Sequence, residues 1–595
     1  MYRQPPKINT DTAADIERQL IADLIPGSEV GGVQKNVEGS LNAMIKIFSY
    51  YCQLIIDRQN KSLDKNFLAF LNLLGASLKP AQPARVLLTF TMTKGASVDA
   101  LIPKGTQVAA QITSDRRDMV VYETEADFVA TSFELVNEPS FAFQDDNFLK
   151  LYFCLPKNRK ELPRSSITLY VVIDSKQESN DPEYLSWQYS SSSKDGWSDL
   201  AVDDETNHFT RSGFLSYIPP ADFSQADQGF CIRVIKGKNA RYNIRQIHLN
   251  TTRAIQAISV RNEVLGSSNG SERQAFNTAR HPILAGPNKP RLEVRDPASA
   301  PAEEHWISWE EKPDFFTSGP QDRHYVINHV KGEIIFGDGH HGMIPPLGKR
   351  NIRMAYYQTG GGLAGNQPIG SIVNLKTTIP YVKSVVNYFP ATGGTDPETI
   401  SALKERVPCS LRHQGRAVTL EDYEDLAKEA SREVARAKCV QLSPGSVQLT
   451  IVPSTADPQP RPTTDLRALI HDFLAKHCDP SATLEITDPV YIEIEVATKV
   501  AVIFQAQPSI ITKSIEQRIA GFLHPLTGGF DGLGWEFNRK PYRSDLYRLL
   551  ESVAEVDYVY SLEILEKSPR LSNDQPKPFL ISSGIHKVTI QSTTP

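Results

Sequence analysis

The sequence predicts a multidomain α+β protein with N-terminal helices, a central β-rich region and C-terminal α/β sandwich modules. At 595 residues the chain is too long for a single hydrophobic core. Apolar residues recur at helical spacing before residue 80, short strands rich in Val, Ile, Thr and aromatic residues follow, and helices alternate with strands after Gly393. These changes of pattern place domains at 1–80, 81–393, 394–488 and 489–595, with an inserted domain at about 133–320.

The segment between residues 41 and 74 carries apolar side chains every three or four positions, which is the spacing of amphipathic helices. We expect two helices there, and Gly75 and Pro80 supply the stop before the first strand. The apolar residues concerned are Met44, Ile45, Phe48, Tyr51, Ile55, Phe67, Phe70, Leu71 and Leu74.

The chain after Gly393 predicts two α/β units. Thr419 can cap a helix that runs through Glu433, because Asp422 three residues later completes a capping box. A second helix follows Thr464, and strands beside it complete a compact sandwich. The expected strands are Ser446–Val452 and Val490–Val502, and the last module adds helices at Thr512–Leu523 and Ser544–Val553 and a strand at Tyr558–Ile564.

Composition excludes several classes of protein. The formal net charge of -5 and the isoelectric point near 6.3 give no attraction to nucleic acid, which needs concentrated Lys and Arg. Neither a secretory signal nor an apolar run long enough to span a membrane is present, so we expect synthesis in the cytoplasm. The six cysteines are scattered, and we expect buried free thiols without a metal.

A glycine-rich stretch matches a nucleotide-binding motif in spacing only. Gly360, Gly362 and Gly365 satisfy GxGxxG, but phosphate binding needs a helix behind the glycines, and residues 366–375 alternate like a strand. Nucleotide-binding proteins with this motif also carry an acidic residue about 20 positions after the glycines, which binds the ribose. Here that position is occupied by Val385. We expect these glycines to permit positive φ and close chain approach in a β loop, and we expect no cofactor.

Asp338, His340 and His341 form a cluster that is rich in metal-ligating side chains. Adjacent histidines in a strand point to opposite faces, so they cannot both bind the same metal ion unless the chain turns. Asp338 and Gly339 have the chemistry of a hairpin tip without any ion. We therefore expect a turn here and no metal site.

Two more motifs resemble chemical sites but lack the necessary context. Ser268 lies in a GxSxG pattern, yet a nucleophile elbow needs a parallel sheet with helices, and this region is β-rich with loop-like composition. The Gly-rich loop at 528–537 lacks the alternating acids of a calcium loop. We therefore expect no enzyme. In that loop Trp535 either anchors an interaction surface or covers the core of the last module, and the sequence leaves both open.

Four separated segments resemble the baseplate J-like family of contractile phage tails and contractile injection systems. The most specific one runs from Lys331 to Asn366, where an FGDG turn, paired prolines and a glycine-rich stretch follow in fixed order. Its characteristic turn residues are Gly337, Asp338, Gly339, Gly360, Gly361, Gly362, Gly365 and Asn366. The other segments are Asp64–Phe90, Ile102–Val108 with Val121–Phe128, and Phe522–Phe537 together with Val418–Ala427.

The resemblance implies a structural wedge subunit of an inner baseplate. Copies similar to this chain pair through C-terminal regions into a six-fold ring around the hub and link it to the sheath, and N-terminal helices bundle with other wedge subunits. The implied partners are a second copy or a paralogue, a sheath-initiator-like protein, hub or spike proteins and sheath proteins, in an assembled tail-like baseplate. The candidate interface residues are Phe48, Tyr51, Phe67, Phe70, Trp535 and Phe537.

A β-rich carbohydrate-binding or hydrolytic protein is the alternative function. In that case the tryptophans of the β region would act as platforms for sugar rings, although aromatic residues in β sandwiches are more often part of the core. The tryptophans concerned are Trp187, Trp197, Trp306 and Trp309.

Overall fold

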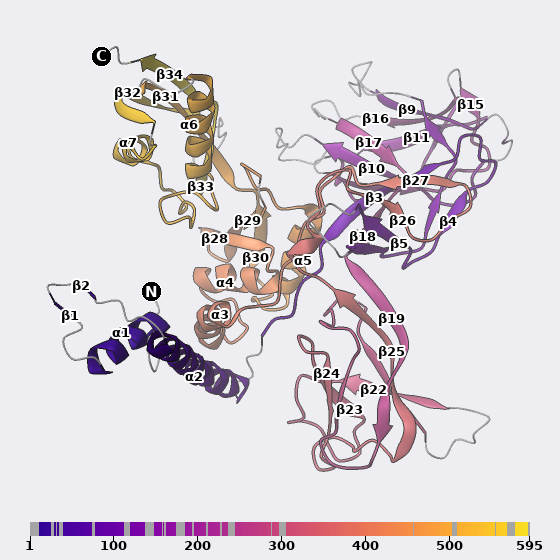
Figure 1. The fold of residues 1–595 in the computed structure, drawn as a ribbon. Coiled ribbons are helices and arrows are strands. Elements are labelled where there is room, and N and C mark those ends of the chain that lie inside the picture. Colours follow the sequence, from indigo (N-terminus) through magenta and orange to yellow (C-terminus); the bar gives the residue numbers. More distant parts are fainter. Residues whose placement is uncertain are drawn as a thin grey trace. The chain divides into compact units, whose positions relative to one another are not determined.

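The computed structural model describes a β-rich chain with barrel-like sheets and with helices near the N-terminus and in the C-terminal part (Figure 1). The predicted fold class therefore holds at this coarse level. The described residues run from 11 to 592, without 25–28, 31–32, 35–39, 74–77, 112–118, 137–147, 157–158, 160–161, 174–184, 193–195, 210–211, 227–228, 236–243, 287, 297–304, 456, 503–507, 554 and 568–577.

One compact unit combines residues 1–79 with residues 397–414. Two short strands in it, β1 (Glu29–Val30) and β2 (Val33–Gln34), pair antiparallel. Leu403 and Val407 of the last helix pack on Leu71 near the end of the second. Its helices are α1 (Ala13–Leu24), α2 (Ser40–Leu73) and α3 (Ile400–His413).

The prediction of two helices between residues 41 and 74 was wrong, because α2 is one continuous helix of 34 residues. The mostly polar stretch from Asn60 to Lys65 interrupts the apolar pattern but contains no Gly or Pro, so nothing in it breaks the helix. Leu74 and Gly75, where the helix was expected to end, lie outside the described residues.

The second unit, residues 80–396 and 415–595, begins with an antiparallel sheet of order β26-β5-β6-β18-β3-β27. Leu88, Phe90 and Tyr122 lie in its core. A short pair, β4 (Ala100–Ile102) with β7 (Phe128–Ala130), contributes to the same core. The strands of the sheet are β3 (Arg85–Met92), β5 (Gln107–Ala110), β6 (Val121–Thr124), β18 (Thr251–Ile255), β26 (Ile372–Leu375) and β27 (Val382–Val386).

Between β7 and β18 the chain forms two further sheets around one core, which includes Leu151, Phe153 and Leu169. Their orders are β13-β14-β10-β17 and β12-β11-β16-β9-β8, and β15 pairs with β16. The strands are β8 (Glu134–Leu135), β9 (Phe148–Cys154), β10 (Ile167–Ile173), β11 (Ser186–Ser190), β12 (Trp197–Asp199), β13 (Asp203–Asp204), β14 (Gly213–Tyr217), β15 (Gln225–Ala226), β16 (Gly229–Ile235) and β17 (Ile244–Leu249).

A long antiparallel pair, β19 (Ala257–Ser268) with β25 (Gly348–Gly360), leads to another sheet of order β19-β25-β21-β22-β23-β24-β20. Its core contains Trp309, Tyr325 and Phe336. The remaining strands are β20 (Ala275–Asn277), β21 (Arg291–Arg295), β22 (Trp306–Glu311), β23 (His324–Asn328) and β24 (Glu333–Phe336).

An α/β layer follows, in which α4 (Leu420–Ala430) and α5 (Thr464–Ala475) pack on a sheet of order β28-β29-β30. The predicted capping box is confirmed, since Thr419 accepts from the backbone N–H of Asp422 and Asp422 accepts from that of Thr419. The strands are β28 (Val434–Ser443), β29 (Ser446–Pro453) and β30 (Thr483–Thr487).

The last sheet is built around β31 (Val490–Val502), which pairs antiparallel with β32 (Val556–Lys567) and parallel with β33 (Phe579–Ser583) and β34 (Lys587–Ser592). The strand predicted at Val490–Val502 is therefore confirmed in its bounds. It was expected in one sandwich with the strand at Ser446–Val452, both beside the helix after Thr464, but it belongs to this last sheet. β30 pairs with β29 instead. The helices of this module are α6 (Pro508–Phe522) and α7 (Arg543–Glu551).

Candidate protein interface

Helix α2 carries an apolar seam that is open to solvent. Its members alternate at spacings of three and four residues, as the core positions of a coiled coil do. Their side chains are between 45% and 68% exposed, and no described residue of this unit buries them. The seam consists of Leu41, Met44, Phe48, Tyr51 and Ile55.

A face of α2 next to the seam is already covered. Ile45 and Ser49 are buried, and so is Ile21 of α1, which packs against this helix. Tyr50 and Leu54 widen the exposed apolar surface beside the seam. An exposed surface of this kind is a candidate site of protein contact, because isolated soluble proteins rarely leave contiguous apolar patches uncovered.

Phe67 and Phe70 do not continue the seam in the same way. Phe67 is half-buried against the cluster of Leu71, Leu403 and Val407, and the Lys404 ammonium lies 5.3 Å from the centre of its ring. Phe70 is exposed. Of the predicted interface residues in this unit, three are therefore open and Phe67 serves the packing of α2 on α3.

Trp535 belongs to the core of the C-terminal module. Its side chain is only 5% exposed, and its indole Nε1–H donates to the carbonyl of Phe522 at 2.8 Å. The ring also meets Phe522 edge-on. Phe537 is half-buried with Val452, Tyr491 and Leu580. The structure therefore favours the core interpretation for Trp535, whereas Phe537 stays partly exposed beside its cluster.

Arg436 of β28 holds the glycine-rich loop that contains Trp535. Its guanidinium donates to the carbonyl of Trp535 at 2.7 Å and also to that of Leu533, and burial lowers the pKa of Arg436. The sequence analysis did not identify Arg436. Its hydrogen-bond partners lie about 100 positions away, and no local sequence pattern around an arginine in a strand indicates them. Arg436 ties the α/β layer to the C-terminal module.

The glycine-rich stretch after β25 forms a β loop, as predicted. Gly360, Gly361 and Gly362 have φ of 147°, 86° and 101°. A Cβ at Gly365 would lie 1.9 Å from the side-chain oxygen of Gln256. A 3-10 helix of three residues follows, so this loop has no long helix behind it to bind phosphate. Asn366 exchanges two hydrogen bonds with the backbone of Gly394, at 2.8 and 2.9 Å.

The FGDG segment forms the expected turn. The Asp338 carboxylate accepts from the backbone N–H groups of His341 at 2.7 Å and His340 at 3.0 Å and pairs with Arg273 at 3.0 Å. The hydrogen bond from His341, followed by the contacts with Arg273 and His340, holds the pKa of Asp338 well below its usual range. Gly337 packs against the backbone of Gly342 and Gly339 has a φ of 85°. Across the described ranges, His, Cys, Asp and Glu side chains do not gather in groups that could hold a metal ion.

Residues 415–487, which comprise α4, β28, β29, α5 and β30, match the family model of the Baseplate J-like central domain. This part of the chain resembles the baseplate J-like family. The match supports a baseplate-related structural role. The comparison with curated proteins gave no match.

Two solved baseplates are similar to this chain at 12% identity. The anti-feeding prophage baseplate, determined by cryo-electron microscopy with six-fold symmetry, aligns over 97% of this chain and 90% of that chain with a TM-score of 0.36. The TssK-TssF-TssG baseplate subcomplex of the type VI secretion system aligns over 76% of this chain and 96% of that chain with a TM-score of 0.38.

Ser268 is a structural residue. It is buried at the end of β19, not in a flexible loop as expected, and its hydroxyl donates to the carbonyl of Pro345 at 2.8 Å. The same oxygen accepts from the Gln274 side chain at 3.1 Å and from the Gly270 N–H. These three hydrogen bonds of the Ser268 hydroxyl hold the end of β19 in place.

The four tryptophans of the β region do not form sugar platforms. Trp187 and Trp309 are buried in two separate cores. The ring of Trp197 lies under the Arg233 guanidinium and that of Trp306 lies under the Arg353 guanidinium, at 4.0 and 3.9 Å. Stacking on these faces would require the arginines to leave, so the structure gives no support to the carbohydrate-binding alternative.

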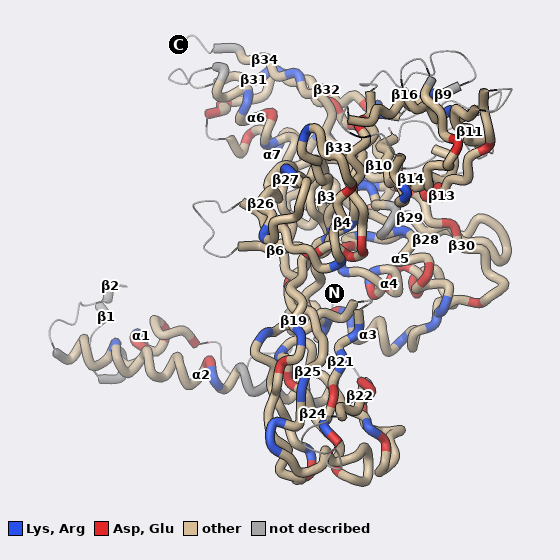
Figure 2. The backbone as a smooth tube through the Cα atoms, turned by 90° about the vertical axis from the view of Figure 1, so that its right-hand side faces the viewer, with Lys and Arg blue, Asp and Glu red and all other residues tan. Residues whose placement is uncertain are grey.

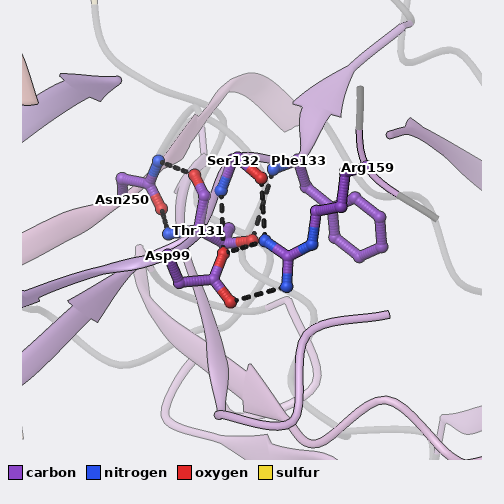
Figure 3. Close-up of polar contacts among 6 residues, drawn as sticks. All are labelled: Asp99, Thr131, Ser132, Phe133, Arg159 and Asn250. Atoms are coloured by element: carbon purple, nitrogen blue, oxygen red, sulfur yellow. Dashed lines mark hydrogen bonds and ion pairs between the residues drawn. The ribbon is translucent and has the colours of Figure 1, made fainter. Parts of the chain in front are cut away.

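Figure 3 shows the junction where the chain leaves β7 for the inserted sheets and returns into β18. Asn250 bonds twice to the backbone of Thr131, and the Arg159 guanidinium binds both oxygens of Asp99 at 2.5 and 2.9 Å. Arg159 also donates to Ser132 at 2.8 Å. The inserted sheets are thereby fastened to the sheet from which they emerge.

Acidic and basic residues are interspersed along the described elements (Figure 2). This distribution agrees with the small net charge and does not form the one-sided basic track that polyanions need. Within the described helices, none is both long and apolar enough to cross a bilayer.

Proposed function

We propose that this chain is a wedge subunit of the inner baseplate ring of a contractile tail or injection machine. Six wedges surround the hub and connect it to the sheath. Residues 1–80 enter a helical bundle with other wedge subunits, and residues 489–595 make the ring contact. The partners are a second copy or a paralogue, a sheath-initiator-like protein, and the hub and sheath proteins of the assembled particle.

The exposed seam of α2 supports this proposal most directly. Five apolar side chains at alternating spacings of three and four residues span about 21 Å of helix, at 1.5 Å per residue. Such a seam gains stability when partner helices insert their own apolar side chains between its members. A structural subunit without a helical partner would keep this surface in water at a cost of about 25 cal/mol per Å².

A pair of charge substitutions on the seam tests the proposal. The double variant Phe48→Glu/Tyr51→Glu should lose co-elution with co-expressed wedge and sheath-initiator-like subunits in size-exclusion chromatography, because two carboxylates would have to be buried in the bundle. The matched control Lys46→Glu/Gln53→Glu changes the same helix outside the seam and should co-elute like the wild type. Full co-elution of the seam variant, with unchanged helix content by circular dichroism, would refute the bundle.

A further inference from the structure

One edge of β31 is shared by two consecutive strands, β33 and β34, while β32 occupies the other edge (Figure 1). β33 pairs with β31 up to Ser583, which lies opposite Ile494, and β34 continues from Lys587, which lies opposite Ala497. The outer chain therefore advances four residues while β31 advances three. The extra residue makes a β-bulge, and the backbone ladder is interrupted there.

The imidazole of His586 fills this interruption. The backbone N–H of Val496 donates to Nδ1 of His586 at 3.2 Å, so a ring nitrogen takes the place of a strand carbonyl. Gly584 lies at the other end of the bulge, where its N–H donates to the carbonyl of Ile494 at 3.0 Å. The pairing of β34 with β31 thus begins at a hydrogen bond from a backbone to a side chain.

The other hydrogen bonds of the bulge fix which nitrogen of His586 carries the proton. Because Nδ1 accepts from Val496, Nε2 carries the proton of the neutral ring and donates to the Ser583 hydroxyl at 2.8 Å. That hydroxyl donates in turn to the carbonyl of Gly584 at 3.4 Å. Each donor in this series meets an acceptor. The ring is therefore a structural connector and not the base of a nucleophilic serine.

The surroundings of His586 favour the neutral ring. Burial lowers the pKa of His586, and the Glu495 carboxylate of β31 opposes this effect only in part. Glu495 is itself paired with the Lys567 ammonium of β32, and Lys587, the next residue of the chain, adds an exposed positive charge. β33 contributes the uncharged Ser583. Among the described residues of α6, which packs against β34, no charged side chain adds to the shift.

We propose that His586 is a pH-sensitive contact that holds β34 on β31 when the ring is neutral and releases it when the ring is protonated. Protonation converts Nδ1 from an acceptor into a donor, so the Val496 N–H loses its partner and two N–H groups face each other. Nε2–H keeps its bond to Ser583. The change is therefore confined to the contact between β34 and β31.

The direction of the pH dependence follows from the two environments of the ring. When β34 leaves β31, the ring enters water and the pKa of His586 returns to its ordinary value of about 6.5. The contact is therefore complete above about pH 6.5 and is lost as the pH falls through the native pKa of His586.

Hydrogen–deuterium exchange of the full chain, read by mass spectrometry, tests the contact. Peptides that cover 494–502 and 587–592 should lose protection at least about fivefold between about pH 7.5 and about pH 5, as expected for one lost hydrogen bond. Protection is corrected for the pH dependence of intrinsic exchange. Peptides from β28 and β29 should keep their protection and serve as the internal reference.

Substitutions at His586 separate the acceptor from the proton. His586→Asn supplies an acceptor oxygen that does not titrate, and His586→Phe keeps a ring without an acceptor. The protection ratio between the two pH values should be close to one in both variants, and His586→Phe should be less protected than the wild type at the higher pH. His524→Asn changes the other histidine of residues 489–595 and should keep the acid response of the wild type.

The ratio between the two pH values decides the outcome in every sample. A wild-type chain without a loss of protection at the lower pH overturns the inference. An acid response that persists in His586→Asn and His586→Phe also overturns it, because the titrating group then lies elsewhere. The contact concerns the fold of the C-terminal module alone, so its failure leaves the wedge proposal and its co-elution test through α2 unaffected.

Discussion

The side-chain amide of Asn250 forms two hydrogen bonds with the backbone of Thr131, and we call this pair of bonds the clasp. The Thr131 N–H donates to Oδ1 at 2.9 Å, and Nδ2–H donates to the Thr131 carbonyl at 2.8 Å. Both residues are buried. Thr131 follows β7 and Asn250 precedes β18, so the clasp joins the point where the chain leaves the first sheet to the point where it returns (Figure 3).

Removing the clasp should loosen this junction. Asn250→Ala removes two buried hydrogen bonds, each contributing about 1 kcal/mol, so the Thr131 amide should exchange with solvent roughly thirtyfold faster. Asn250 has a φ of 58°, which disfavours Ala but not Gly. Asn250→Gly therefore isolates the loss of the hydrogen bonds. Unchanged exchange at Thr131 in both variants would show that the clasp does not hold the junction.

The ion pair of Asp99 with Arg159 should contribute to stability mainly by avoiding an unpaired buried charge. The side chains are 14% and 9% exposed. Asp99→Ala or Arg159→Met alone should lower the free energy of unfolding of this region by about 3–5 kcal/mol. The double variant should lose clearly less than the sum of the two. Additive losses in urea denaturation would contradict this explanation.

Trp535 should affect folding and not partner binding. Trp535→Phe keeps most of the apolar contact but loses the hydrogen bond to the Phe522 carbonyl, which should cost about 1–2 kcal/mol. Trp535→Ala should cost about 3–5 kcal/mol through the cavity that it leaves. Thermal denaturation measures both. Trp535→Phe should co-elute with wedge partners as the wild type does. Loss of co-elution without loss of stability would show that Trp535 contacts a partner.

Two buried thiols should resist alkylation. Burial raises the pKa of Cys231 to about 11 and that of Cys439 to about 12, so at pH 8 both remain protonated and unreactive in the native chain. Cys478 is only partly buried, so it serves as the comparison. Mass spectrometry after iodoacetamide treatment should find Cys231 and Cys439 modified only once urea is added.

The same shifts set a pH dependence of stability. A free cysteine has a pKa of about 8.5, so above that pH the unfolded chain releases thiol protons that the native chain keeps. The stability that protonated Cys231 and Cys439 contribute is complete below about pH 8.5 and is lost as pH rises through their native pKa values. Replacing both with Ala should flatten this alkaline loss in urea titrations from pH 8 to 11.

Predictions that depend on neighbours in the sequence agreed best with the structure. The capping box of Thr419 and Asp422 closes within four residues, and the glycines from Gly360 to Gly362 need only their own positive φ. Helix α3 was missed because Leu403 and Val407 are its only buried apolar residues and Pro408 lies inside it. Its packing on Leu71 joins segments more than 300 positions apart, which no local pattern indicates.

The sequence by itself determined the baseplate J-like resemblance, most of the described helices, some of the strands, and the turns at Asp338 and Gly360, because these depend on residue chemistry over short distances. Only the tertiary structure decided which apolar residues are covered. Trp535 and Phe48 both look like contact residues in the sequence, yet one lies against Phe522 in a core and the other faces solvent. Burial depends on elements brought together from distant positions, and a residue's own sequence neighbourhood does not contain that information.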